Sequence, residues 1–353
     1  MRVLQLIDSL DPGGAERIAV TFANSLSGKI SYSALCTTRK EGLLKDGLQK
    51  EVDYLFLRKK GVFDIFSLIR LLKFVRANDI EIIHAHSSSF FFGWILKIFR
   101  PKLKLIWHDH YGKSEQLTER KSGVLKLCSR RFFGIIAVNQ LLKNWAEQNL
   151  HAGKVLFLRN FVTLEKYLPS EVHLGGTKNF RIVCLANFRR QKNHLNLIRA
   201  FEVVLEKQPQ ASLHLIGKPV DIDYYENLRA YISENRIENV TLHGEQVNVL
   251  GLLSKCDIGV IASDSEGLPV ALLEYGVAGL AVVTTKVGEC AMVVNGYGEI
   301  VEAGDYSELA KAILKYFEDQ EQRSDLALAF QRHIKENYSA DAVLPQLIAF
   351  YRG

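Results

Sequence analysis

Two carboxylates lie eight positions apart near residue 270, in a segment whose other residues favour anion binding. Glu266 and Glu274 are the ends of the run EGLPVALLE. Pro269 suits the first turn of a helix, because its missing N–H would have no partner there. We therefore place Glu266 in the loop before a helix and Glu274 inside the helix. The backbone N–H groups of Gly267 and Leu268 would then lie at the positive end of the helix dipole, where they can bind an anion.

The residues before these carboxylates indicate a ligand site. Residues 257–262, DIGVIA, form a short apolar run of the kind found in a buried strand. In an open α/β sheet, ligands bind at the carboxyl ends of the strands. The alternative is an ordinary strand and helix with two solvated glutamates. We favour the ligand site because strand, loop and helix start follow one another directly.

A second loop carries cations at an equivalent position. Residues 180–185 predict a strand, and the loop that follows contains Arg189, Arg190 and Lys192. Guanidinium and ammonium groups together suit a diphosphate. Either arginine could contact it, and a solvated basic loop is the alternative interpretation.

A glycine pair forms a third candidate for phosphate binding. Gly13 and Gly14 stand between a predicted strand, residues 3–7, and an amphipathic helix that runs to residue 26. Glycines at this position let backbone N–H groups approach a phosphate closely. The spacing is not G-x-G-x-x-G, so hydride transfer with a dinucleotide is weakly supported. A plain tight turn is the alternative.

Histidine pairs end two predicted strands. His84 and His86 end one, and His108 and His110 end the next. Residues i and i+2 of a strand share a face, so each pair projects its rings together. A metal site is compatible with this geometry, but only Asp109 adds an obvious ligand and no cysteine joins it. We expect no metal, and hydrogen bonds from neutral imidazoles to a polar ligand or within the protein.

Predicted strands and helices alternate along both halves of the chain, which indicates two doubly wound parallel-sheet α/β domains. We expect them at residues 1–165 and 175–335, with a linker within 163–178. Two such domains facing each other would form a cleft, the common place for a ligand.

Composition and charge limit the class of protein. The 353 residues are 48% apolar and carry a net charge of +6. Residues 1–170 hold 27 Lys and Arg against 15 Asp and Glu, which leaves 18 against 24 in the remainder. The basic half could meet anionic lipid, nucleic acid or an acidic substrate, or be merely solvated. The predicted helix at residues 63–78 has a purely basic polar stripe, Arg70, Lys73 and Arg76, which fits a membrane surface or a solvated face.

Five cysteines without a C-x-x-C pair fit a reducing compartment. The chain begins with a strand pattern that meets Asp8 at once, unlike a signal peptide. Its most apolar run, residues 90–99, is shorter than the ~20 residues that a spanning helix needs. We expect a soluble or peripheral protein, either free in the cytoplasm or at the inner face of the membrane.

The motifs together resemble those of the retaining glycosyltransferases of family 4, or group 1, which have the GT-B fold. The matching segments are Gly13-Gly14-Ala15-Glu16, Arg189-x-x-Lys192, Glu266-x7-Glu274 with Gly276, the strand end at His108, and Val287-Gly288-Glu289. The resemblance covers essentially the whole chain. It departs from the family at Ala186-Asn187-Phe188, where Gly-Arg-Leu is common, and at Asn160-Phe161-Val162, where Asn-Gly-Val is usual.

The resemblance implies a role for each residue. Arg189 and Lys192 would hold the diphosphate of a UDP- or GDP-linked sugar, near Gly13, Gly14, Gly267 and Leu268. Glu274 would bind the ribose, while Glu266 and His108 would contact the sugar. Transfer to a glycan or lipid-linked acceptor would retain the anomeric configuration without a metal or other cofactor, and the leaving phosphate would accept the proton. Residues 336–353 would pack back on the first domain.

The implied pathway is surface polysaccharide biosynthesis. The alternatives are a nucleotide-sugar epimerase of the same fold and a sugar-nucleotide binding module without activity. Nucleic-acid binding is the least supported, because predicted buried strands interrupt the basic residues and no nucleic-acid motif accompanies them.

Overall fold

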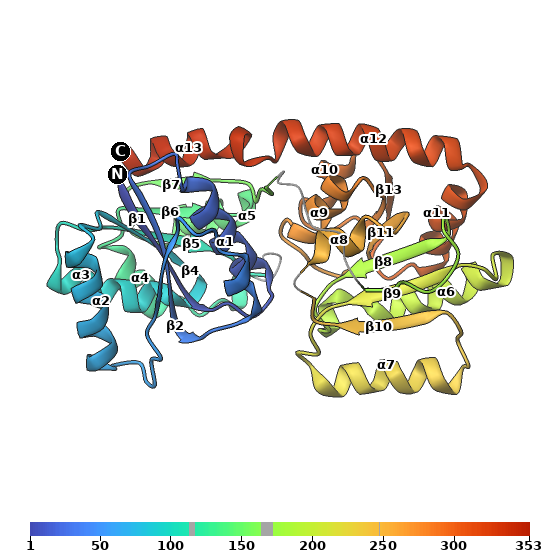
Figure 1. Ribbon diagram of the computed structural model, residues 1–353, viewed down its shortest axis with the longest axis horizontal. Coiled ribbons are helices and arrows are strands. Elements are labelled where there is room, and N and C mark those ends of the chain that lie inside the picture. The colour runs from blue at the N-terminus through green and yellow to red at the C-terminus, as the bar shows by residue number, and fades with distance from the viewer. Residues whose placement is uncertain (113–116, 164–171, 247) are drawn as a thin grey trace. The chain divides into compact units, whose positions relative to one another are not determined.

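The chain forms two compact units. The computed structural model describes residues 1–112, 117–163, 172–246 and 248–353. One unit comprises Met1–Thr163 and Ala340–Gly353, and the other comprises Leu164–Ser339. Each is built on a parallel sheet with helices on both faces (Figure 1). The predicted fold class is confirmed. Residues 164–171, half of the predicted linker at 163–178, lie outside the described residues.

The first unit contains a sheet of seven parallel strands in the order β3-β2-β1-β4-β5-β6-β7. The order reverses between β1 and β4, which makes the carboxyl end of β1 a topological switch point. The strands are β1 Arg2–Ser9, β2 Tyr32–Lys40, β3 Asp53–Phe56, β4 Ile82–His86, β5 Lys104–Asp109, β6 Gly134–Ala137 and β7 Val155–Phe157.

Alternating side chains of these strands supply two cores. Leu4 and Leu6 of β1 face a large core, whereas Ile7 faces a smaller one under the first helix. The helices of this unit are α1 Gly14–Leu26, η1 Leu43–Gly47, α2 Ile65–Ala77, η2 Ser87–Ser89, α3 Phe90–Phe99, η3 Leu117–Glu119, α4 Gly123–Ser129, α5 Gln140–Asn149 and α13 Ala340–Arg352. Helices α2, α3, α4 and α5 cover the large core, and α1 with η1 covers the small one.

The last helix, α13, packs on the first unit. The Lys104 ammonium donates to the carbonyl oxygens of Tyr351 and Arg352, each at 2.9 Å. A cation at these carbonyls also complements the negative end of the helix dipole. Phe350 lies so close to Gly134 that a Cβ there would stand 2.4 Å from its ring. The C-terminal segment is thus an integral layer of the first unit.

The second unit contains six parallel strands in the order β10-β9-β8-β11-β12-β13. The order reverses between β8 and β11, the switch point of this sheet. The strands are β8 Arg181–Leu185, β9 Ser212–Ile216, β10 Val240–Gly244, β11 Ile258–Ile261, β12 Ala281–Thr285 and β13 Glu299–Val301.

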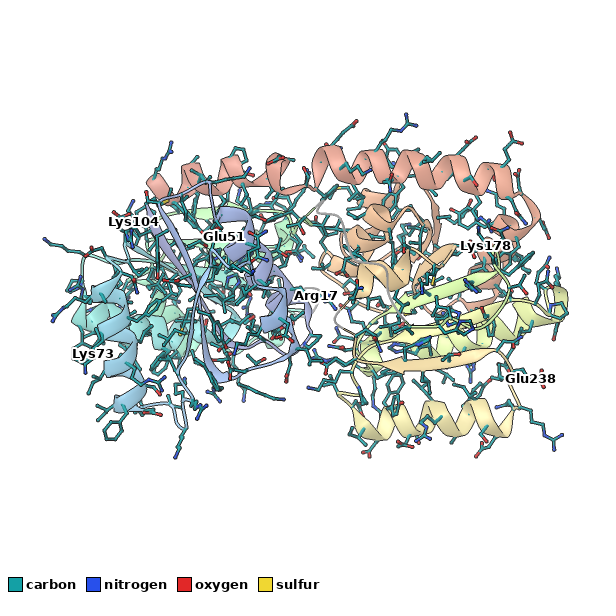
Figure 2. All side chains as sticks on the ribbon, in the orientation of Figure 1. Arg17, Glu51, Lys73, Lys104, Lys178 and Glu238 are labelled. Atoms are coloured by element: carbon teal, nitrogen blue, oxygen red, sulfur yellow. The ribbon has the colours of Figure 1, made fainter. Side chains whose placement is uncertain are left out.

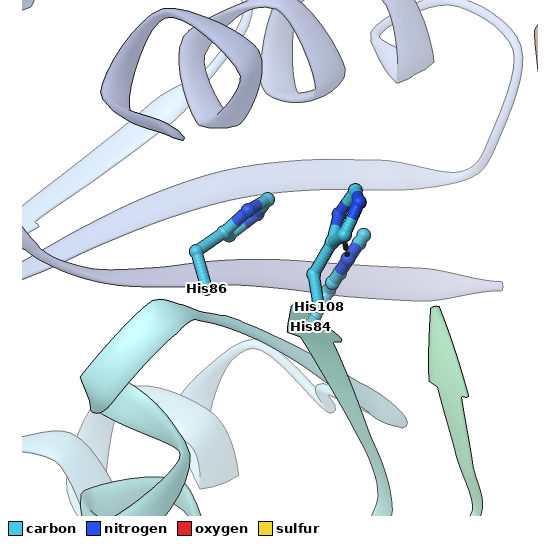
Figure 3. Close-up of side chains that lie close together, drawn as sticks. All are labelled: His84, His86 and His108. Atoms are coloured by element: carbon cyan, nitrogen blue, oxygen red, sulfur yellow. Dashed lines mark hydrogen bonds between the residues drawn. The ribbon is translucent and has the colours of Figure 1, made fainter. Parts of the chain in front are cut away.

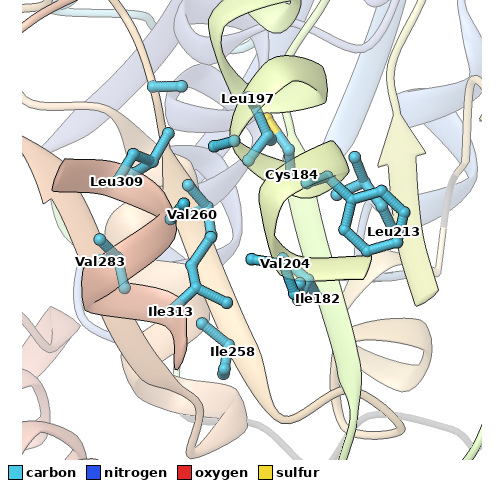
Figure 4. Close-up of a cluster of buried hydrophobic side chains, with 14 of the residues drawn as sticks. Ile182, Cys184, Leu197, Val204, Leu213, Ile258, Val260, Val283, Leu309 and Ile313 are labelled. Atoms are coloured by element: carbon cyan, nitrogen blue, oxygen red, sulfur yellow. The ribbon is translucent and has the colours of Figure 1, made fainter. Parts of the chain in front are cut away.

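Helices α6 and α11 cover one face of this sheet over a core of aliphatic side chains that includes Val204, Val260 and Ile313 (Figure 4). The helices of the unit are η4 Arg190–Lys192, α6 His194–Lys207, α7 Ile222–Glu234, α8 Val249–Leu253, α9 Val270–Ala278, α10 Cys290–Val294, α11 Tyr306–Glu318 and α12 Gln320–Asn337. Cys184 belongs to this core and Cys36 to the large core of the first unit. Among the described residues, no helix combines the length and the apolar character needed to span a bilayer.

Candidate functional site

Tyr275 separates the two strands at the switch point of the second unit. The strands β8 and β11 pair only at Ile182 with Ile258 and at Val183 with Gly259. Beyond these pairs the Tyr275 hydroxyl accepts from the Leu185 N–H at 2.7 Å and donates to the Val260 carbonyl at 3.2 Å. Its ring needs the glycine at 259, where a Cβ would stand 2.5 Å from a ring carbon. The carboxyl ends of the strands are therefore held by a side chain where a direct ladder bond would otherwise form.

Lys192 and Glu266, from the loops after these two strands, form an ion pair. The Lys192 Nζ lies 2.5 Å from the Glu266 Oε1, and the Ser263 hydroxyl donates to the same oxygen at 2.7 Å. The Glu266 side chain is 8% exposed and that of Lys192 18%. The structure thus brings together two residues for which separate contacts, to diphosphate and to sugar, are expected.

Backbone contacts from residues 287–289 hold the Glu266 loop in place. Gly288 has a φ of 51°, and a Cβ there would lie 2.3 Å from the Glu266 carbonyl oxygen. The Glu289 N–H donates to the Gly267 carbonyl at 2.9 Å. The segment Val287-Gly288-Glu289 is therefore a support for the loop, and only glycine fits its centre.

Further hydrogen bonds join the two switch-point loops to each other. The Asp264 N–H donates to the Gln191 carbonyl at 2.9 Å. The Asn193 amide donates to the Asp264 carboxylate at 2.7 Å, and Asn193 itself has a left-handed φ of 46°. These hydrogen bonds fix the two loops against each other.

The two arginines of the first loop differ in their partners. The Arg190 Nε lies 3.3 Å from the Asp221 carboxylate, and its guanidinium stands over the Tyr224 ring. Arg189 is exposed and forms no ion pair within the part of the chain that the structure describes. On this geometry Arg189 is the guanidinium that a phosphate could recruit without breaking an existing ion pair.

Glu266 and Glu274 occupy the predicted local structures. Glu266 lies in the loop, Pro269 is the N-cap of α9, and Glu274 is buried in the second turn of that helix. Gly267 is partly exposed and Leu268 is buried. Their N–H groups lie before the first turn of α9, so the dipole of that helix favours an anion beside them.

Gly13 and Gly14 stand at the carboxyl side of β1, at the switch point of the first sheet. Helix α1 begins at Gly14 and Gly13 is its extended N-cap. A Cβ on Gly13 would meet the Glu16 carboxylate at 2.3 Å, whereas one on Gly14 would meet nothing within 4 Å. Gly14 is thus required by no protein contact, and the space above it is open to a ligand.

The four predicted histidines form one network in the first unit (Figure 3 shows three of them). Ring nitrogens of His84 and His108 lie 3.1 Å apart, and those of His86 and His110 lie 3.0 Å apart. The Phe22 ring of α1 packs against three of these rings. The centroid distances are 5.2 Å to His84, 6.1 Å to His86 and 5.6 Å to His108. Most of the network is therefore part of the interior beneath α1.

Hydrogen bonds also fix tautomers in this network. The His86 Nε2 lies 2.8 Å from the Gln5 side-chain oxygen, which can only accept, so His86 donates there. A neutral His86 must then accept at Nδ1 from the His110 N–H. Burial lowers the pKa of His84 and of His110 to about 3 and that of His108 well below its ordinary value. All these rings are neutral at pH 7.

Three imidazole nitrogens, from His84, His86 and His108, lie within 4.8 Å of one another. A group of this kind could hold a metal ion. In this structure a hydrogen bond joins two of its members, His84 and His108.

His108 and His110 differ in their access to solvent. His108 is 1% exposed, and its Nε2 has no hydrogen-bond partner among the described residues. His110, at the strand end, is partly exposed. A sugar could reach His110 directly, whereas contact with His108 requires movement of its surroundings.

Three residues near these sites escaped sequence analysis. The Arg120 guanidinium holds the buried Asp109 carboxylate with two hydrogen bonds of 2.6 and 2.8 Å, and burial nevertheless raises the pKa of Asp109. Ser263 holds Glu266, and Tyr275 separates the strands. Only Ser263, at the end of a predicted strand and three residues before Glu266, carried a usable signal.

The whole chain matches known proteins. A family model described as glycosyl transferases group 1 matches residues 170–332, and one described as Glycosyltransferase Family 4 matches residues 12–166. The O-antigen biosynthesis glycosyltransferase WbnH of Escherichia coli is 33% identical over 340 residues, which cover 95% of this chain and 96% of that protein. A galactosyltransferase of Escherichia coli named UDP-Gal:alpha-D-GlcNAc-diphosphoundecaprenol alpha-1,3-galactosyltransferase is 24% identical over 73% of this chain and 71% of its own.

Solved structures agree in fold. HepE of Anabaena in complex with UDP and glucose superposes with a TM-score of 0.82 at 20% identity, over 100% of both chains. Sucrose-phosphate synthase of Thermosynechococcus elongatus gives 0.77 at 16% identity, over 100% of this chain and 98% of that one. The chain therefore belongs to the family 4, or group 1, glycosyltransferases with the GT-B fold.

Proposed function

We propose that this glycosyltransferase moves a sugar from a nucleotide diphosphate sugar to a glycan or lipid-linked acceptor, with retention of configuration, in surface polysaccharide biosynthesis. The names of WbnH and of the galactosyltransferase support the pathway and a lipid-linked acceptor. The UDP complex of HepE supports a UDP-linked donor, with GDP as the alternative base. The enzyme would work in the cytoplasm, where such donors are made.

The observation that carries the proposal is the pair of Lys192 and Glu266 at the switch point. An incoming diphosphate competes with the Glu266 carboxylate for the Lys192 ammonium. Arg189 and the N–H groups of Gly267 and Leu268 supply further positive potential for the same anion. Glu266, still held by Ser263, then accepts hydrogen bonds from the sugar hydroxyls. Binding of the donor thus frees the carboxylate that orients the sugar.

The chemical step breaks the bond between the anomeric carbon and the phosphate oxygen and forms a bond from that carbon to the acceptor oxygen on the same face. The proton of the acceptor hydroxyl passes to the leaving phosphate oxygen, so no protein base is needed. Lys192 and Arg189 stabilise the charge that develops on the diphosphate. Glu274 binds the ribose, Gly13 and Gly14 admit phosphate at the first unit, and a neutral histidine, His110 or His108, faces the sugar. No metal is required in this scheme.

Calorimetry of nucleotide binding tests the assignment of Lys192. Lys192→Ala should weaken binding of UDP or GDP by ~1.5–3 kcal/mol, the value of a charged hydrogen bond. Lys178→Ala is the matched control, because that lysine is exposed on the same unit. Unchanged affinity in Lys192→Ala would refute the role.

Turnover assays test the reaction class. The proposal expects transfer that depends on an acceptor and survives EDTA. Donor turnover without any acceptor would indicate an epimerase, and nucleotide binding without turnover a binding module. Activity lost in EDTA and restored by Mg²⁺ would overturn the metal-free scheme.

A further inference from the structure

Three neighbouring helices cover one side of the first sheet and leave apolar side chains in water. Helices α2, α3 and α4 pack on the large core of this unit and lie together in Figure 1. We call their outer surface the α2–α4 face. Its most exposed apolar residues are Phe63 and Phe66, 76% and 82% exposed, with Ile65, Phe99, Val124 and Leu127.

Helix α2 shows why this surface is unusual. Its inner side is apolar through Leu68, Leu71 and Val75. The outer side of an ordinary surface helix would be polar, yet the first turns of α2 expose Ile65 and Phe66. The Phe63 ring just before the helix lies against Phe91 of α3 at a centroid distance of 6.1 Å. The exposed apolar residues therefore continue from α2 to α3, and a contiguous patch of this kind marks an interaction surface.

The same face is positively charged. The three helices carry Arg70, Lys73, Arg76, Lys97 and Lys126 and contain no Asp or Glu. Within the described part of the chain, none of these five forms an ion pair with a carboxylate. Arg70 donates instead to the carbonyls of Phe56 and Leu57, and Lys97 to that of Leu103.

Lys73 projects outward from α2 (Figure 2). The loop before α2 adds Arg58, Lys59 and Lys60. The acidic side chain there, Asp64, caps α2 by accepting from the Ser67 N–H at 3.0 Å. The positive charge of the face is thus left for a partner from outside the chain.

We propose that the α2–α4 face docks on the surface of an anionic lipid bilayer. Exposed phenylalanines beside lysines and arginines are the composition of interfacial helices, whose apolar side enters the boundary between headgroups and acyl chains. Phe63 and Phe66 would enter this boundary, and the lysines and arginines would contact lipid phosphates. This extends the proposed function, because a lipid-linked acceptor would be presented at the same surface.

Charge separates this partner from two others. A symmetric dimer through the face would place its uncompensated cations against those of a second copy, which costs free energy. A nucleic acid would satisfy the charge but not Ile65, Val124 and Leu127, which are aliphatic and cannot stack on bases as aromatic side chains do. A bilayer satisfies both the apolar and the basic residues.

Vesicle sedimentation tests the proposal with the intact chain. The protein should bind vesicles of phosphatidylcholine with phosphatidylglycerol, bind phosphatidylcholine alone at least about tenfold more weakly, and lose affinity at high salt. The double substitution Phe63→Ser with Phe66→Ser should weaken binding at least about tenfold. The same loss is expected for Lys73→Glu with Arg76→Glu.

Matched controls lie on the second unit. Leu328→Ser removes an apolar side chain that is 58% exposed on α12, and Lys178→Glu reverses an exposed lysine. Both should leave vesicle binding unchanged. All variants alter exposed residues outside the donor site, so UDP affinity and the melting temperature should stay at wild-type values. This separates failure of the docking proposal from failure of the proposed function.

Three results would overturn the proposal. The first is equal binding to both kinds of vesicle. The second is vesicle binding that neither double substitution weakens. The third is a dimer in analytical ultracentrifugation that the Phe66→Ser change dissociates. The last result would assign the face to a second copy of the chain instead.

Discussion

The Glu266 carboxylate accepts from an ammonium, Lys192, and a hydroxyl, Ser263, at one of its two oxygens. While Lys192 pairs with Glu266, the charge of the carboxylate is neutralised. Under the proposed function, a diphosphate would attract Lys192 and the carboxylate would regain its charge for the sugar.

Glu266→Gln separates these two effects. Glutamine keeps an oxygen for Ser263 but lacks the charge that competes for Lys192. We expect UDP affinity to stay the same or rise, while kcat falls about a hundredfold, as when a group acts mainly in the transition state. Calorimetry and steady-state kinetics give the two quantities. Glu238→Gln, at an exposed carboxylate elsewhere on the same unit, is the control, and a Glu266→Gln enzyme with wild-type kcat would exclude the role.

At the scale of secondary structure, the position of the loops depends on how β8 and β11 are held apart. The Tyr275 hydroxyl bridges the Leu185 N–H and the Val260 carbonyl at the carboxyl ends of these strands. Lys192 and Glu266 follow within a few residues of those ends. The neighbour of Tyr275 in α9 is Glu274, the proposed ribose ligand, so one helix turn serves both purposes.

Tyr275→Phe should disturb donor binding more than the chemical step. Removing the hydroxyl leaves two backbone groups without their partner, which costs ~1–3 kcal/mol when they are buried. We expect KM for the donor to rise several-fold with a smaller change in kcat. Tyr316→Phe is the control, because its hydroxyl donates to the Val282 carbonyl at 3.1 Å, away from the two loops. If both variants lose stability alike and neither changes KM, Tyr275 has only a structural role.

Sequence alone predicted the elements better than their side-chain contacts. The helix signals placed Glu266 in the loop before α9 and Glu274 inside that helix, because the preference of Pro269 for a helix start acts locally. The ion pair of Lys192 with Glu266 joins residues 74 positions apart. Its formation depends on strand order, which no local pattern encodes. Arg120 and Asp109 are only 11 positions apart, but no spacing motif marks the hydrogen bonds between them.

For the histidines, the sequence predicted which rings share a face but not what covers that face. The i, i+2 spacing correctly predicted that His84 and His86 share a face, as do His108 and His110. It could not show that the face is closed by Phe22 of α1 and by Tyr351 of α13, whose hydroxyl lies 2.6 Å from the His84 Nδ1. Because these distant segments cover the rings, His84, His86 and His108 are buried in the interior of the unit.

At the scale of the first unit, this buried network makes stability depend on pH. An imidazole with a folded pKa of about 3, such as His84 or His110, is neutral in the native protein, while the unfolded chain binds a proton below pH ~6.5. Because the unfolded state then binds more protons, the free energy of unfolding falls as the pH falls from 6.5 toward 3. The raised pKa of Asp109 acts in the opposite direction, and only nearer the acidic end of that range.

Tryptophan fluorescence during urea unfolding at pH 7 and pH 5 measures this dependence. The signal reports on the first unit by itself, because all three tryptophans of the chain, Trp94, Trp107 and Trp145, lie there. Each buried histidine should remove about 2 kcal/mol between the two conditions. His84→Gln, which cannot be protonated, should lower the starting stability but reduce the loss between pH 7 and pH 5 by that amount. His151→Gln, at an exposed ring, should change neither value. An equal loss in wild type and His84→Gln would mean that the network is protonated in the native state at pH 5.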